Sequence, residues 1–141
     1  MTDGPLHPRS VLETALYADD LDAAESFYAT VLNLPVIARI PGRHVFFRMD
    51  QGVLLIFNPE QTRIPTENTT LPVPPHGASG PGHVCFAATR AQIALWRDRL
   101  TDHGVAIEAE FDWPNGARSL YFRDPAGNSL EFAEPHLWDR Q

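Results

Sequence analysis

The chain has 141 residues, of which 43% are hydrophobic and 21% are charged, and its formal net charge at pH 7 is -7. This length is enough for one domain with a buried core, and this composition is typical of soluble proteins rather than of disordered or membrane-spanning ones. The acidic balance, with no basic stripe to offset it, argues against a nucleic-acid partner.

The first elements in chain order are a strand and a helix. The N-terminal MTDGPLHPRS lacks the basic-then-apolar pattern of a signal peptide, so we expect a cytoplasmic protein. Val11 to Tyr17 alternates between apolar and polar residues and ends at Asp19 and Asp20, which predicts a strand that meets a helix cap. Residues at helical spacing then form one apolar stripe: Leu21, Ala24, Phe27, Tyr28, Val31 and Leu32.

A hairpin and a linker follow this helix. The stretch RHVFFRMDQGVLLIF, residues 43–57, is predicted to form two strands around a polar turn. Residues 58–82, NPEQTRIPTENTTLPVPPHGASGPG, are rich in Pro, Thr and Gly, which is typical of a loop or linker. No apolar run approaches the roughly 20 residues of a membrane helix, so we expect no membrane association.

The second half repeats these elements. His83 to Ala88 is a short apolar strand, and Thr89 with Gln92 forms a capping-box pattern at the start of a helix. The stretch RSLYFRDPAGNSLEF, residues 118–132, is again two strands around a polar turn. We therefore predict an α+β fold in which a β-α-β-β-β module occurs twice. Module 1 covers about residues 11–57, the linker 58–82 and module 2 83–135, within a single domain of residues 1–141.

Three polar side chains are predicted to share the sheet face that points away from the helices. Strand alternation places Glu13, His83 and Glu131 there, and Glu13 and His83 begin equivalent strands. Carboxylate oxygens and an imidazole nitrogen suit one divalent ion, Zn²⁺, Mn²⁺, Ni²⁺ or Fe²⁺, with positions left open for water or substrate. The alternative is three unconnected residues: a solvent-facing Glu, a core His and an edge-strand Glu.

A mostly apolar substrate pocket is predicted around these groups. Cys85, the only cysteine, excludes an internal disulfide and a thiolate cluster for zinc, and we expect it to be a buried, inert thiol and not a nucleophile or a ligand. Trp113 either closes one end of this pocket or packs in a turn, and the sequence identifies no catalytic residue. Four histidines, His44, His76, His103 and His136, are assigned to the surface or to loops. The predicted pocket residues, for which ordinary sheet packing is the alternative, are Tyr17, Phe46, Leu54, Ile56, Cys85 and Tyr121.

Three stretches resemble the vicinal oxygen chelate superfamily, which includes glyoxalase I, fosfomycin-resistance proteins, extradiol dioxygenases, methylmalonyl-CoA epimerase and bleomycin-binding proteins. They are LYADDLDAAESFYATVLNLPV (16–36), GHVCFA (82–87) and YFRDPAGNSLEF (121–132). The last is close to the recurrent F-x-D-P-x-G-N-x-x-E ending and is the most specific. The resemblance spans about residues 11–135 and implies curved mixed sheets that form a cup, with the helices on the outer face.

The resemblance places metal ligands on Glu13, His83 and Glu131. Four-ligand members such as glyoxalase I use a further ligand from the last strand of module 1, and alignment of the hairpins on their glycines puts Ile56 at that position. Glu13 departs from the pattern, because a His is commoner there. One His among three ligands points away from ring-cleaving dioxygenases and toward Lewis-acid chemistry on an oxygen-rich substrate.

The resemblance implies a metal-dependent, glyoxalase-like enzyme that acts on a small molecule. Isomerase, lyase and thiol or water transferase reactions all remain open, and the substrate is not identified. The alternative is a metal-free small-molecule or drug-binding protein of the bleomycin-resistance type. Short members commonly pair modules between two chains, so we expect a homodimer in which Glu13 of one chain completes a site with His83 and Glu131 of the other. Closure within one chain is the other possibility.

Overall fold

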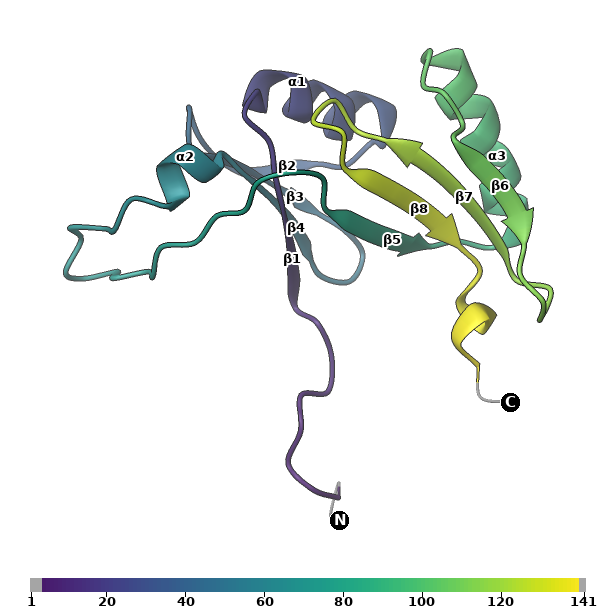
Figure 1. The fold of residues 1–141 in the computed structure, drawn as a ribbon, viewed down its shortest axis with the longest axis horizontal. Coiled ribbons are helices and arrows are strands. Elements are labelled where there is room, and N and C mark those ends of the chain that lie inside the picture. Colours follow the sequence, from purple (N-terminus) through teal and green to yellow (C-terminus); the bar gives the residue numbers. More distant parts are fainter. Residues whose placement is uncertain (1–3, 140–141) are drawn as a thin grey trace.

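The computed structural model describes residues 4–139 and contains two four-stranded sheets (Figure 1). The first has the strand order β1-β4-β3-β2 and the second the order β5-β8-β7-β6, with the first two strands of each list parallel and the other neighbours antiparallel. These mixed sheets confirm the predicted α+β class and its repeated module. The strands are β1 (Glu13–Tyr17), β2 (Val36–Ile40), β3 (His44–Arg48), β4 (Val53–Phe57), β5 (His83–Ala87), β6 (Ala109–Asp112), β7 (Arg118–Arg123) and β8 (Ser129–Ala133).

The helices α1 (Leu21–Ser26) and α3 (Arg90–Asp102) lie on the same side of the two sheets (Figure 1). The helix α1 continues as a π-helical segment, η1 (Phe27–Val31), and α3 begins with the predicted capping box of Thr89 and Gln92. Across residues 4–139, the structure contains no helix with the length and apolar character needed to cross a membrane. The opposite face of each sheet is therefore left without a helical cover, which is where the polar residues of interest lie.

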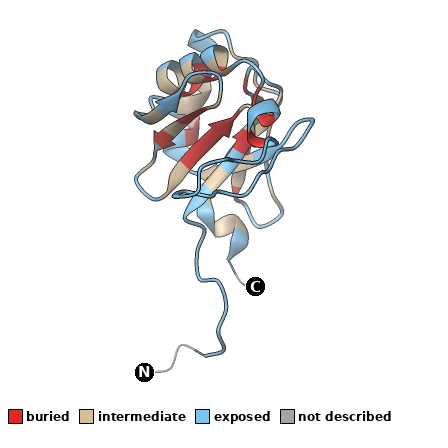
Figure 2. Ribbon diagram, turned by 90° about the vertical axis from the view of Figure 1, so that its left-hand side faces the viewer, coloured by how far each residue is buried: buried red, intermediate tan, exposed pale blue. Residues whose placement is uncertain are grey.

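A hydrophobic core fills the space between the helices and both sheets. Tyr28 of η1 packs against Phe47 of β3, with ring centroids 5.4 Å apart, and Phe27 packs against Phe122 of β7 at 6.3 Å. Figure 2 shows the buried residues concentrated in the central strands and under the helices. Burial of one such large apolar side chain contributes about 1.5–3 kcal/mol to folding. This core joins residues of both modules, so the two modules share one hydrophobic core.

The segment between the modules is mostly an exposed loop, as its composition predicts, but it begins with a short helix, α2 (Pro59–Thr62). Asn58 caps this helix, and Thr62 is buried. The tyrosine hydroxyl of Tyr17 lies 2.7 Å from Nδ1 of His76, which fastens the loop to the end of β1. A Cβ atom at Gly82 would lie 2.9 Å from Leu16 Cδ2, so glycine permits the loop to return close to β1.

The turn between β7 and β8 ties the two modules together through buried hydrogen bonds. The Tyr28 hydroxyl donates to Asp124 Oδ2 at 2.6 Å, and the backbone N–H of Asn128 donates to Asp124 Oδ1 at 2.9 Å. The Asn128 amide donates to the Tyr17 carbonyl at 3.1 Å, while its Oδ1 accepts from the Gly82 backbone N–H at 2.7 Å. The D-P-x-G-N stretch that carries the family resemblance is thus a structural link in this protein.

Ionic contacts fasten the outer helix to its sheet. The Glu110 carboxylate on β6 accepts hydrogen bonds from Arg97 of α3 and from Arg118 of β7, and these hold the pKa of Glu110 at about 2. The Arg99 guanidinium donates to the carbonyl of Val31 at 2.7 Å, which caps the end of η1. These contacts keep α3 fixed against both modules.

Candidate metal centre

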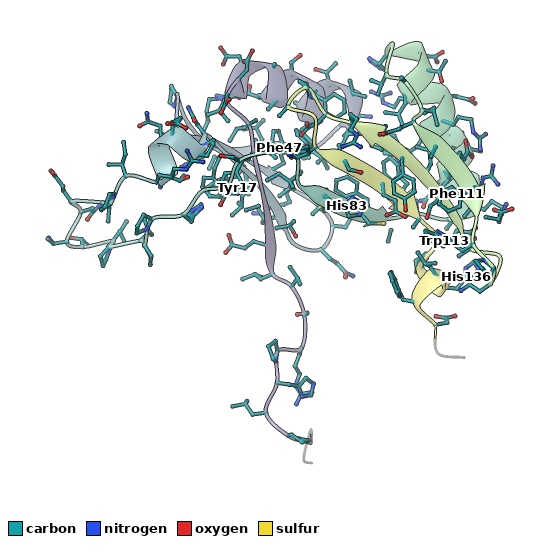
Figure 3. The ribbon with its side chains drawn as sticks, in the orientation of Figure 1. Tyr17, Phe47, His83, Phe111, Trp113 and His136 are labelled. Atoms are coloured by element: carbon teal, nitrogen blue, oxygen red, sulfur yellow. The ribbon has the colours of Figure 1, made fainter. Side chains whose placement is uncertain are left out.

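The open face of the second sheet carries a cluster of polar side chains. The parallel register of β5 and β8 pairs Cys85 with Glu131, and the antiparallel register of β7 and β8 pairs Tyr121 with Glu131. Because paired residues share a face and faces alternate along a strand, His83 and Ser119 lie on this face too. Figure 3 shows His83 on this sheet, with Phe111 and Trp113 toward its outer edge.

The contact between His83 and Glu131 is the feature that most suggests a bound cation. His83 Nδ1 lies 2.9 Å from the Ser129 carbonyl oxygen, and since a carbonyl can only accept, Nδ1 carries a hydrogen. The other ring nitrogen, Nε2, lies 3.3 Å from Glu131 Oε1. With a hydrogen on Nδ1 of a neutral ring, Nε2 is an acceptor that faces the acceptor Oε1, so a proton or a divalent cation between the two atoms would make this contact favourable. A histidine that binds a metal through one ring nitrogen commonly donates a hydrogen bond from the N–H of the other ring nitrogen, as Nδ1 does here.

The second oxygen of Glu131 has its own partner. Ser119 Oγ donates to Glu131 Oε2 at 2.6 Å, and Trp113 Nε1 donates to Ser119 Oγ at 2.7 Å. Ser119 is fully buried, and Glu131 is 5% exposed. The sequence analysis gave Ser119 no role, and it left the role of Trp113 open. The structure assigns both to a chain of hydrogen bonds that ends on Glu131.

Two further groups surround this carboxylate. Burial, followed by the negative charge of Glu131, raises the pKa of the Cys85 thiol to about 12, although part of the residue is exposed. Burial and hydrogen bonding to Glu131 likewise raise the pKa of Tyr121 to about 12. Both groups therefore keep their protons at neutral pH, but Cys85 is exposed, so its expected burial was wrong.

Glu13, the third predicted ligand, is exposed at the start of β1, where it pairs with Val53 on the first sheet. Residues 4–139 contain no group of three or more His, Cys, Asp or Glu side chains arranged to hold a metal ion. One chain therefore brings together His83 and Glu131 but does not bring Glu13 to them.

Two predicted pocket residues, Leu54 and Ile56, lie on the wrong face for that role. Both are fully buried in the core with Leu16, on the side that the helices cover. Four residues (49–52) separate β3 from β4, whereas five (124–128) separate β7 from β8. Alignment on the turn glycines is therefore shifted by one residue, and a shift of one residue exchanges the two faces of a strand. The counterpart of Glu131 in module 1 is Leu55, because Ala15 pairs with Leu55 as Cys85 pairs with Glu131.

The remaining predicted pocket residues, Tyr17 and Phe46, do lie on the open face of the first sheet. His44 stacks on Phe46 with ring centroids 4.0 Å apart, and Phe57 packs edge-on against His44 at 5.8 Å. His44 is only 7% exposed, so its assignment to the surface was wrong, and burial and Arg43 hold its pKa below the ordinary value. This face is therefore aromatic, in contrast to the polar face of the second sheet.

The family model described as Glyoxalase/Bleomycin resistance protein/Dioxygenase superfamily matches residues 10–132. The chain belongs to this superfamily. The resemblance inferred from the three sequence stretches is thereby confirmed. The comparison with curated proteins found no match to this chain.

Solved structures agree with this membership. This superfamily member is 45% identical to a lactoylglutathione lyase from Agrobacterium tumefaciens, with 94% of this chain and 98% of that chain covered and a TM-score of 0.89. A glyoxalase/bleomycin resistance protein/dioxygenase from Nocardioides is 24% identical, with coverage of 93% and 86% and a TM-score of 0.71. TioX from Micromonospora sp. ML1 is 22% identical, with coverage of 89% and 98% and a TM-score of 0.69. The last two show similarity of fold alone.

Proposed function

We propose that this protein is a metal-dependent, glyoxalase-like lyase that acts on a small molecule whose neighbouring oxygen atoms bind the metal. The observation that carries the proposal is the approach of His83 Nε2 to Glu131 Oε1 at 3.3 Å, with the other polar atom of each side chain already hydrogen bonded. A divalent ion bound by both atoms satisfies both lone pairs. The 45% identity to a protein named lactoylglutathione lyase favours a lyase over an isomerase or a thiol or water transferase.

We propose that Glu13 of a second copy supplies the third ligand. Support comes from the position of Glu13, which faces solvent in its own chain instead of approaching His83. The segment before β1 extends away from the sheets (Figure 1). Two of its leucines are exposed to solvent, Leu6 with a relative accessible surface of 101% and Leu12 with one of 77%. Larger exposed apolar patches mark protein–protein contacts, and we infer that these residues form part of one. A homodimer would cover them and bring the aromatic face of one chain opposite the polar face of the other.

The proposed donor set matches a divalent transition metal. Two carboxylates and one neutral imidazole carry two negative charges, which balance Zn²⁺, Mn²⁺, Ni²⁺ or Fe²⁺ and leave positions open. When bound, such an ion polarises a substrate oxygen and makes a neighbouring C–H or a water more acidic. The protein itself would contribute orientation: Ser129 fixes the His83 ring, and Ser119 and the protonated Tyr121 hydroxyl hydrogen bond to Glu131.

The proposal is tested by removing and restoring the metal in protein purified without a histidine tag. We expect chelation to lower turnover of lactoylglutathione, the compound in the name of the 45% identical relative, by at least about 100-fold, since the polarising cation is lost. Reloading with Zn²⁺, Mn²⁺, Ni²⁺ or Fe²⁺ in turn should restore turnover with at least one of them. Circular dichroism of the chelated protein provides the control for folding. Full turnover after chelation, or no turnover with any of the four ions, would contradict the proposal for this substrate class.

The alternative function is metal-free binding of a small molecule or drug, as in bleomycin-resistance proteins. The observation in its favour is that a proton between His83 and Glu131 satisfies the pair within one chain, without any metal. Under this alternative, the purified protein would retain no stoichiometric metal, and the chelated protein would bind bleomycin as tightly as the untreated protein.

A further inference from the structure

The hydrogen bonds that lead to Glu131 have a fixed direction. An indole N–H can only donate, so Trp113 Nε1 occupies a lone pair of Ser119 Oγ at 2.7 Å. The Ser119 hydroxyl hydrogen is therefore free to point at Glu131 Oε2, which lies 2.6 Å away. This arrangement makes Oε2 the acceptor of a short, charge-assisted hydrogen bond.

Water does not compete with these bonds. Ser119 is fully buried and Glu131 is 5% exposed, so each polar atom depends on its protein partner. Among residues 4–139, no buried side-chain nitrogen or oxygen lacks a hydrogen bond. Removal of the Ser119 hydroxyl takes one donor from this buried carboxylate, and the carboxylate can then turn toward its other neighbours.

Trp113, the first donor in this series of hydrogen bonds, is held in place by its own backbone and ring contacts. Trp113 lies in the turn between β6 and β7. Its backbone N–H donates to the Ala117 carbonyl at 2.7 Å, and its backbone carbonyl accepts from the Gly116 N–H at 2.8 Å. Its ring packs against Phe111, with centroids 4.9 Å apart. The indole is therefore placed by the backbone of a tight turn and not by the metal ligands.

We propose that Trp113 and Ser119 are positioning residues that hold the Glu131 carboxylate so that Oε1 alone binds the metal. This inference rests on the proposed metal centre and adds which oxygen of Glu131 takes part and what keeps the other away. The bond from Ser119 holds Oε2 on the buried side, so that Oε1 faces His83 Nε2 on the open side. Residues that orient ligands in this way typically change metal affinity by about 10–100-fold when they are replaced.

The test is the dissociation constant for Zn²⁺ and for Mn²⁺, measured by titration calorimetry on wild-type protein and four variants. Ser119→Ala removes the donor, and we expect the dissociation constant to rise about 10–100-fold. Ser119→Thr keeps the hydroxyl and should restore affinity to within about threefold of the wild type. Trp113→Phe leaves the hydroxyl without its orienting donor and should raise the constant about tenfold. Trp138→Phe, at a residue 85% exposed and outside the chain of hydrogen bonds, is the matched control and should change nothing.

A spectroscopic measurement separates positioning from a general loss of structure. Isotope-edited infrared spectra report whether one or both carboxylate oxygens bind a metal. We expect the metal-loaded wild type to show one-oxygen binding by Glu131 and Ser119→Ala to shift toward two-oxygen binding. Should Ser119→Ala fail to fold, Trp113→Phe is judged by the same two measurements.

Three outcomes would overturn the inference. Unchanged affinity in both Ser119→Ala and Trp113→Phe, in a protein that loses its metal with His83→Ala, overturns the positioning role and leaves the metal centre intact. Binding of the metal by both oxygens of Glu131 in the wild type would also overturn the positioning role and leave the metal centre intact. Failure of the wild type itself to bind either ion overturns both the inference and the proposed function.

Discussion

Replacement of His83 by alanine is expected to weaken metal binding by at least about 100-fold, because two carboxylates alone make a poor site for a transition metal. The ring is fixed by the Ser129 carbonyl on Nδ1, so its remaining nitrogen, Nε2, already faces Glu131 before any metal arrives. Loss of this preorganised donor removes both a ligand and the partner that faces the carboxylate. Titration calorimetry and metal analysis of tag-free protein measure the effect.

The matched control for this variant is His103→Ala. His103 is exposed at the end of α3 and lies outside the polar cluster, so its replacement should leave the metal content unchanged. Stoichiometric metal retained by the His83 variant would show that the ion binds elsewhere. Equal loss of metal in both variants would indicate a nonspecific effect of histidine removal and would also count against the site.

Replacement of Asp124 by alanine is expected to lower the free energy of unfolding by about 3–5 kcal/mol, since it leaves buried donors without an acceptor. Asp124 is 5% exposed and accepts from the Tyr28 hydroxyl and from both the backbone and side-chain nitrogens of Asn128. Burial of the Tyr28 ring, followed by the negative charge of Asp124, raises the pKa of the Tyr28 hydroxyl far above the ordinary value. Urea unfolding followed by circular dichroism measures the change.

Two companion variants make this result interpretable. Asp50→Ala changes an exposed aspartate in the corresponding turn of module 1 and should alter stability by less than about 0.5 kcal/mol. Tyr28→Phe removes one donor, and its effect should not add to that of Asp124→Ala, because the two side chains share one hydrogen bond. A loss below about 1 kcal/mol for Asp124→Ala would show that the turn does not link the modules energetically.

Local patterns in the sequence were sufficient to predict the repeated modules and the polar face of the second sheet. Strand alternation depends only on the order of residues, so His83, Tyr121 and Glu131 could be assigned to one face without a structure. The capping box of Thr89 and Gln92 could be recognised because its spacing is local. These features do not depend on contacts between distant parts of the chain.

The face of β4 was not predictable from the glycines that end the turns. Gly52 directly precedes Val53, whereas Asn128 stands between Gly127 and Ser129. Because of this extra residue, the alignment of the two hairpins on their glycines was shifted by one position, and it assigned Leu54 and Ile56 to the wrong face of the sheet. The extra residue has a function of its own, since the Asn128 side chain contacts β1 and the linker. The error therefore arose where the second turn departs from the first in order to hold the modules together.

Contacts between distant residues were also beyond sequence patterns. Tyr28 read as one more apolar position of a helical stripe, yet its hydroxyl meets Asp124 in the other module. Ser119 read as a small polar residue on a strand, yet its hydroxyl connects Trp113 to Glu131. Each of these bonds depends on how strands and turns pack, which local periodicity does not specify.

Mixing two inactive variants tests most directly whether a second copy completes the site. Glu13→Ala and His83→Ala chains are refolded together in equal amounts, and bound Zn²⁺ is counted per chain. If sites are shared, a mixed dimer has one site with Glu13, His83 and Glu131 all intact and one site with two lesions. Random pairing then returns about a quarter of the wild-type metal content. Refolding Glu13→Ala with a chain that carries both substitutions is the control, because no intact site can form.

We expect metal binding to return in the first mixture and not in the control. We also expect a dimer by light scattering at micromolar concentration. No return of metal in the first mixture, in protein shown to form mixed dimers, would contradict the shared site, as would a monomeric wild type that binds one metal ion per chain.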